Sequence, residues 1–178
     1  MRYGDAFALA CALTLVRWAI MGYAAWHDAR TRTFPNGLAA VFVFVCAAEA
    51  FTSGGLTHLS LPDGAGGLQE GGFLVASGGR ALVMNAIAAN VVFAALYVFE
   101  LVWRHFRNAP GIGMGDLKFL FALMLIEPVK AIIAFVLGLV ALAITGVATR
   151  KSPLPLLPFV VGAYFALLIA GLFVSTGI

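Results

Sequence analysis

Long apolar runs separated by short polar stretches make up most of this chain of 178 residues. A transmembrane helix needs about 20 predominantly apolar residues to cross a hydrocarbon core of roughly 30 Å. Most of the runs approach or reach this length. The pattern therefore predicts an all-α, polytopic membrane protein with about six transmembrane helices. We expect them at residues 6–26, 37–52, 80–103, 117–127, 129–148 and 156–175.

The fourth expected helix, at 117–127, is too short to cross a bilayer. It ends at Glu127-Pro128, and a proline disfavours the helical conformation of the residue before it. A half-length helix is tolerated at membrane depth only where it packs inside protein or lines a cavity. We therefore expect it to lie inside the bundle.

The stretch 52–79 breaks the apolar pattern with nine glycines among polar residues. We interpret it as a flexible glycine-rich loop. An alternative for residues 73–76, less favoured, is a short segment that dips into the membrane. The whole chain, 1–178, is predicted to form a single integral-membrane domain that carries this loop on the extracytoplasmic side.

Composition agrees with this interpretation and excludes a sizeable soluble domain. Hydrophobic residues make up 62% of the chain and charged residues 11%, and the mean hydropathy is +1.01. Soluble domains carry roughly 45–50% apolar and about 25% charged residues. The net charge of +3 does not point to nucleic acid, because no basic cluster alternates with aromatic residues.

The basic residues predict the orientation in the membrane. Seven of them lie in or beside the loops 27–36, 104–116 and 149–155, which a six-helix chain places on one side. The positive-inside rule puts this side in the cytoplasm. We therefore expect a multi-pass protein of the cytoplasmic (inner) membrane. The seven residues are Arg30, Arg32, Arg104, Arg107, Lys118, Arg150 and Lys151.

Charged residues within the expected helices need an explanation, because each costs about 2.5–3.5 kcal/mol to insert at the bilayer centre. Arg17 lies 11 residues before Asp28, and Glu49 lies 13 after Asn36. On two antiparallel helices these offsets correspond to similar depths of roughly 16 and 20 Å. We expect a structural Arg17–Glu49 ion pair, with a role in transport as the alternative.

Glu100 lies about one turn from the end of the third expected helix. We expect its side chain to reach towards the membrane surface and Arg104.

Asp28 and Asp116 are acidic residues in structured surroundings. Asp28 lies at the cytoplasmic end of the first expected helix, shortly before the turn Phe34-Pro35-Asn36, and Asp116 follows a run with glycines at 111, 113 and 115. Although 88 residues apart, both belong to the cytoplasmic boundary, which makes a catalytic pair of aspartates plausible. Two alternatives stay open: Asp116 as an N-terminal helix cap, and Asp28 as a loop residue paired with Arg30 or Arg32.

At these residues the chain resembles the type IV prepilin peptidases, the GxGD intramembrane aspartyl proteases of bacteria and archaea. Gly113-Met114-Gly115-Asp116 matches the GxGD motif, and Leu117-Lys118 continues it in the family's form. Asp28, with two arginines and Phe34-Pro35-Asn36 after it, is similar to the family's first motif. Leu157-Pro158-Phe159 resembles the element that opens the last helix.

The resemblance implies the GxGD protease fold and an activity. Asp28 and Asp116 would be catalytic, supported by Gly113, Gly115, Lys118, Pro35 and Asn36. The substrate would be a prepilin, whose short basic leader is cleaved after a glycine at the cytoplasmic membrane face, ahead of an apolar N-terminal helix. The chain has no CxxC motif. It therefore looks like the short, peptidase-only branch of tight-adherence (Flp-type) pili, without N-methylation, or like the archaeal preflagellin peptidases.

Two aspartates cleave a peptide when one is ionised and the other protonated. Helix ends favour the anion on Asp116 and the proton on Asp28. Arg30 and Arg32 argue for the reverse. No metal or other cofactor is expected, because His27, His58 and His105 lie in different loops.

Two other classes of function remain as alternatives to the peptidase. One is a small transporter in which Arg17 and Glu49 line a proton path and Asp28 and Asp116 form a gate. The other is a non-catalytic scaffold of a pilus or secretion assembly. The oligomeric state is not determined by the sequence.

Overall fold

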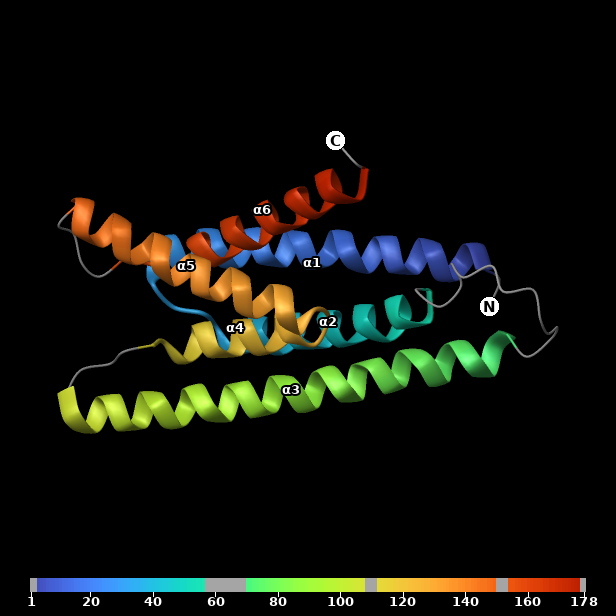
Figure 1. Ribbon diagram of the computed structural model, residues 1–178, viewed down its shortest axis with the longest axis horizontal. Coiled ribbons are helices and arrows are strands. Elements are labelled where there is room, and N and C mark those ends of the chain that lie inside the picture. Colours follow the sequence, from blue (N-terminus) through green and yellow to red (C-terminus); the bar gives the residue numbers. More distant parts are fainter. Residues whose placement is uncertain (1–2, 57–69, 108–111, 150–153, 177–178) are drawn as a thin grey trace.

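The computed structural model describes residues 3–56, 70–107, 112–149 and 154–176. Within these ranges it contains six helices and no strand, which confirms the predicted all-α class (Figure 1). The helices are α1 (Tyr3–Thr31), α2 (Asn36–Leu56), α3 (Glu70–Arg107), α4 (Met114–Met124), α5 (Pro128–Thr149) and α6 (Leu157–Thr176).

The helices extend further than expected into the glycine-rich stretch 52–79. Helix α2 continues to Leu56, and α3 begins at Glu70, so both ends of this stretch are helical. Residues 73–76 belong to α3, and residues 57–69 lie outside the described residues. A glycine costs a helix only about 1 kcal/mol relative to alanine. The glycines at 71, 72, 78 and 79 were therefore weak evidence for a loop next to a long apolar helix.

Three helical segments are long and apolar enough to cross a membrane: Phe7–Thr31, Gly79–Arg107 and Pro128–Thr149. Helices α2 and α6 contain shorter apolar stretches, Asn36–Thr52 and Leu157–Gly171. Many large apolar side chains point outward, among them Phe44 and Phe106, each about three-quarters exposed (74% and 77%). An apolar outer surface of this kind suits lipid better than water.

The chain reverses direction at every connection, so the helices run side by side (Figure 1). The last turns of α1, α3 and α5 and the first turns of α2, α4 and α6 lie towards one end of the bundle, on the left of Figure 1. This end, which carries residues 28–36, 112–118 and 154–157, is referred to below as the site end.

Helix α4 has 11 residues and is therefore roughly 16 Å long, about half of what a bilayer requires. The chain turns back at residues 125–127, partway along α1 and α3 (Figure 1). Asn85 of α3 closes this turn, because its Nδ2 donates to the carbonyls of Leu125 (3.0 Å) and Ile126 (3.1 Å). The expected position of this short helix inside the bundle agrees with the structure.

Buried side chains pack α4 against its neighbours. Phe119 is fully buried, stacks on Phe42 of α2 at 5.0 Å between ring centroids, and meets the edge of Phe34 at 6.0 Å. Leu117, Leu120 and Leu123 are also buried. The core of the protein therefore forms around the shortest helix, which fixes the position of Asp116 in its first turn.

Gly138 allows α5 and α6 to come into close contact. A Cβ at this position would lie 2.7 Å from Val160 Cγ2 and 3.0 Å from the Val160 backbone N and Cα.

We predict that Gly138→Ala destabilises the protein by about 1–3 kcal/mol, because the close contact between α5 and α6 must open to make room for the added Cβ. Thermal unfolding in detergent measures this change. Gly162→Ala is the control, because a Cβ there meets nothing within 4 Å; an equal loss in both variants would contradict the close contact.

Candidate active site

Three segments that are far apart in sequence meet at the site end of the bundle. Asp28 in the last turn of α1 accepts a hydrogen bond through Oδ2 from the backbone N–H of Leu157, which begins α6 (3.2 Å). On α4, Lys118 Nζ donates to Asn36 Oδ1 at 2.6 Å. The structure therefore joins the Asp28 region, the 34–36 turn, the start of α4 and the start of α6 in one cluster.

Helix α1 ends at Thr31, within one turn after Asp28. The Arg32 N–H donates to the Asp28 carbonyl (2.9 Å), and Arg32 takes a left-handed conformation with φ of 54°. This is a common way to end a helix. His27 Nδ1 lies 2.9 Å from both the Thr33 carbonyl and Thr31 Oγ1, which holds the following loop against the helix. The turn thereby fixes Asp28 in the last turn of α1.

The two glycines of the Gly113-Met114-Gly115-Asp116 segment both lie in tight surroundings, and at Gly115 the space leaves no room for a side chain. A Cβ on Gly115 would lie 2.7 Å from Phe34 Cβ, so only glycine lets α4 rest on the 34–36 turn. A Cβ on Gly113 would lie 2.8 Å from Asp116 Oδ2, because the carboxyl group folds back over this residue. The distances explain why glycine occupies position 115; at position 113 a side chain would displace the Asp116 carboxyl group.

Glu100 holds the segment that leads into α4. It is 1% exposed and accepts hydrogen bonds from the Ile112 N–H and from Arg104 Nε, both at 2.6 Å. The contact with Arg104 was expected, whereas the burial of the carboxylate was not. The carboxylate turns inward because its second partner is the Ile112 N–H. The sequence pattern could not show that this N–H would lie beside Glu100.

The two candidate catalytic carboxyl groups act on each other. Asp28 is buried, with 7% of its surface exposed, and Asp116 is half-buried. Burial and, to a smaller extent, the nearby charge of Asp28 raise the pKa of Asp116, and the Gly113 N–H lowers it; together they bring it to about 7. The structure therefore places the two aspartates within electrostatic reach, although 88 residues separate them in sequence.

The alternative roles for these aspartates fit the structure only in part. Gly113 occupies the N-cap position of α4, and Asp116 interacts with its N–H, so a capping role accounts for one contact of Asp116. In the described part of the chain, neither Arg30 nor Arg32 forms an ion pair with Asp28. Arg30 instead lies over the Trp26 ring, 4.5 Å from its centroid. The pairing proposed for Asp28 as a loop residue is therefore wrong.

Arg17 and Glu49 form the expected ion pair in the interior, with Arg17 Nε 2.8 Å from Glu49 Oε2 and both side chains buried. Thr14 Oγ1 donates to Glu49 Oε1 at 2.9 Å. Arg17 Nη1 also donates to the hydroxyl of Tyr164 on α6, at 3.3 Å. This hydroxyl donates in turn to Glu127 Oε2 at 3.3 Å, in the turn between α4 and α5.

Sequence reasoning missed Tyr164 and Glu127 as members of this polar network. The sequence feature that could have revealed this network was Glu127 itself, because it is an acidic residue at the end of an expected helix that is too short to cross a membrane. The network lies away from the two aspartates, since Arg17 is 11 residues, or roughly 16 Å of helix, before Asp28. It joins α1, α2, α6 and the α4–α5 turn, so its role in this structure is to hold helices together.

We predict that Arg17→Gln and Glu49→Gln each destabilise the protein by about 3–5 kcal/mol, because each leaves a buried charge without its partner. The double variant should lose less stability than the sum of the losses in the two single variants. Thermal unfolding in detergent tests both statements. The control is Lys130→Gln, which removes a partly exposed pair with Glu127 and should cost about 1 kcal/mol or less. Additive losses would contradict direct pairing.

Asp116 makes stability depend on pH with a defined sign. The unfolded residue ionises near its usual pKa of about 4, whereas the folded one ionises at about 7. Between these values the folded protein binds more protons, so rising pH destabilises it. We predict that Asp116→Asn raises the unfolding temperature, and more at pH 8 than at pH 5. Asp5→Asn, at an exposed position, is the control. An increase that is equal at both pH values would contradict the raised pKa.

No family model, curated protein or solved structure matches this chain. The resemblance to the prepilin peptidases therefore depends on the motifs themselves, around Asp28, at 113–118 and at 157–159. These are the segments that the structure brings into contact at the site end.

Proposed function

We propose that this protein is an intramembrane aspartyl endopeptidase in which Asp28 and Asp116 form the catalytic pair. The observation that carries the proposal is the electrostatic coupling of a buried and a half-buried carboxyl group, from α1 and α4, at one end of a helical bundle. Ionising both carboxyl groups of such a pair is expensive, so one of them keeps a proton near neutral pH. A protonated and an ionised carboxyl group side by side are the two groups that peptide hydrolysis needs.

The surroundings favour Asp116 as the residue that carries the proton. Its pKa lies at about 7, because it is buried and close to Asp28. Asp28 is also buried, which opposes its ionisation, but it accepts a hydrogen bond from the Leu157 N–H, an interaction that favours its ionised form. This assignment reverses the one expected from helix ends alone. The helix dipole effect, typically 0.3–1 kcal/mol at the surface, is smaller than the cost of burying a carboxylate next to another.

The proposed reaction follows from these roles. Asp28 takes a proton from a water molecule, whose oxygen attacks the carbonyl carbon of the scissile peptide bond. Asp116 donates its proton to the carbonyl oxygen as the tetrahedral intermediate forms. The C–N bond then breaks, and the leaving amine takes up the proton held by Asp28, while the carbonyl re-forms and returns a proton to Asp116. The two carboxyl groups end in their starting states.

Several features support a membrane setting with the site at the cytoplasmic face. The site end carries basic residues in or beside the last turns of α1 and α3 and near the start of α4, as the positive-inside rule requires of the cytoplasmic side: Arg30, Arg32, Arg104, Arg107 and Lys118. We propose a multi-pass bundle of the GxGD type, in which α4 is contained inside the bundle and does not cross the bilayer by itself. The resemblance then suggests the substrate, a Flp-type prepilin cleaved after a glycine at the end of its basic leader.

We predict that the purified protein in detergent removes the leader from a Flp-type prepilin, detected as a mass shift. Asp28→Asn and Asp116→Asn should each reduce the rate by at least about a hundredfold, since each removes an acid–base group. The matched control, Asp5→Asn, changes an exposed aspartate at the start of α1 and should leave the rate unchanged. Cleavage that persists in either site variant would exclude the catalytic pair.

The pH dependence of this cleavage tests the proton assignment. Because Asp116 must be protonated and its pKa is about 7, the rate should fall as the pH rises above about 7. A rate that instead keeps increasing up to pH 9 would contradict Asp116 as the proton donor. If the folded wild-type protein cleaves no Flp-type prepilin, the transporter and scaffold classes gain support.

A further inference from the structure

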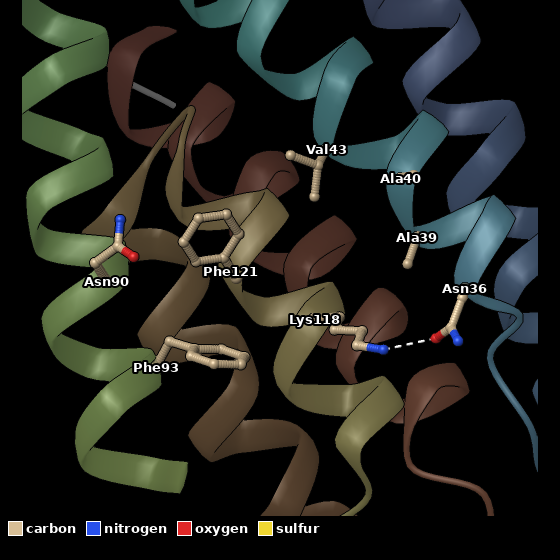
Figure 2. Close-up of a pocket in the computed structure, with 8 residues that line it drawn as sticks. All are labelled: Asn36, Ala39, Ala40, Val43, Asn90, Phe93, Lys118 and Phe121. Carbon is tan, nitrogen blue, oxygen red and sulfur yellow. Dashed lines mark hydrogen bonds between the residues drawn. The ribbon is translucent and has the colours of Figure 1, made fainter.

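A groove of about 500 Å³ lies between α2, α3 and α4, on a side of the bundle that the proposed mechanism does not use (Figure 2). Ala39, Ala40 and Val43 of α2 form one wall. Phe93 of α3 and Phe121 of α4 form the other. The volume falls within the range of roughly 300–1,000 Å³ typical of small-molecule sites.

Polar groups gather at the site end of this groove. Lys118 and Asn36 face each other across it and are joined by the 2.6 Å hydrogen bond from Nζ to Oδ1 (Figure 2). A lysine ammonium has three donors, and only one is used in this bond. Because Asn36 accepts through its oxygen, its amide nitrogen is left as a further donor. In the described residues, no carboxylate forms an ion pair with Lys118.

The groove below this polar end is mostly apolar. Its one other polar residue, Asn90 of α3, donates through Nδ2 to the carbonyl of Ala86 on its own helix, at 2.8 Å. The charged group is therefore confined to the site end, and the alanines, Val43 and Phe121 continue inward from it, while Phe93 lies on the opposite wall, level with Lys118 (Figure 2). This distribution matches an amphiphile with an anionic head and a hydrocarbon tail.

We propose that the groove binds one anionic phospholipid, with its phosphate at Lys118 and Asn36 and an acyl chain between Ala40, Phe93 and Phe121. Basic pockets between transmembrane helices at the cytoplasmic side are suited to anionic lipid headgroups. The basic leader expected for the substrate does not suit this groove, because its positive charges would be repelled by the Lys118 ammonium group. The proposal does not depend on the peptidase activity, since it is tested by binding alone.

Native mass spectrometry of the purified protein in detergent tests the site, with phosphatidylglycerol and phosphatidylcholine of identical acyl chains as the probes. We expect one phosphatidylglycerol molecule to be retained in preference to phosphatidylcholine. Lys118→Gln should weaken phosphatidylglycerol binding by about fivefold or more, as expected for loss of one cation near an anionic lipid, and Lys118→Arg should preserve it. Ala40→Trp should fill the groove and prevent binding with the charge unchanged.

Matched controls separate this site from general lipid adhesion. Lys130→Gln removes a cation that is paired with Glu127 and should not change binding. Ala143→Trp adds the same bulk at an exposed position on α5, outside the groove, and should also have no effect. Equal retention of the two lipids, or unchanged binding in Lys118→Gln, would overturn the proposal. Full competition by glycerol 3-phosphate, which has no acyl chain, would also overturn it, because a headgroup site alone would then suffice.

Discussion

The structure depends on burying a helix that is too short to cross a membrane. Each backbone group at the ends of α4 that lacked a partner would cost several kcal/mol in hydrocarbon. Asn85 supplies donors to the carbonyls of the α4–α5 turn, and Glu100 accepts from the Ile112 N–H just before α4 begins. These contacts, together with the packing of Phe119, hold Asp116 in a fixed position.

The same constraint explains why charged and small residues recur around α4. Tyr164 and Glu127 connect its returning turn to the Arg17–Glu49 pair, so the interior charges are tied to the position of the helix. At its other end, Gly115 lets α4 approach the 34–36 turn closely enough for Lys118 to reach Asn36. One side of α4 thereby presents Asp116 to Asp28, and another presents Lys118 to the groove between α2 and α3.

Much of the fold could be read from the sequence because a membrane protein must satisfy its backbone within each helix. The apolar runs located all six helices, and Glu127-Pro128 indicated the short fourth one. The beginning of α3 could not be read in this way, since glycines weaken a helix without forbidding it. The Arg17–Glu49 pair followed from helix rise and antiparallel order, because depth along a helix is proportional to residue number.

What the sequence alone determined is therefore a helical, membrane-type chain with two aspartates in distinctive motifs. The period and the length of an apolar run depend only on residues that are neighbours in the sequence, so they indicate the local environment of each segment. Only the tertiary structure decided that Leu157 donates to Asp28, that Glu100 turns inward to Ile112, and that burial of Asp116 near Asp28 places its pKa at about 7. Each of these contacts depends on the distance between residues that are far apart in the chain. Helix packing sets this distance, and the spacing of the residues in the sequence does not.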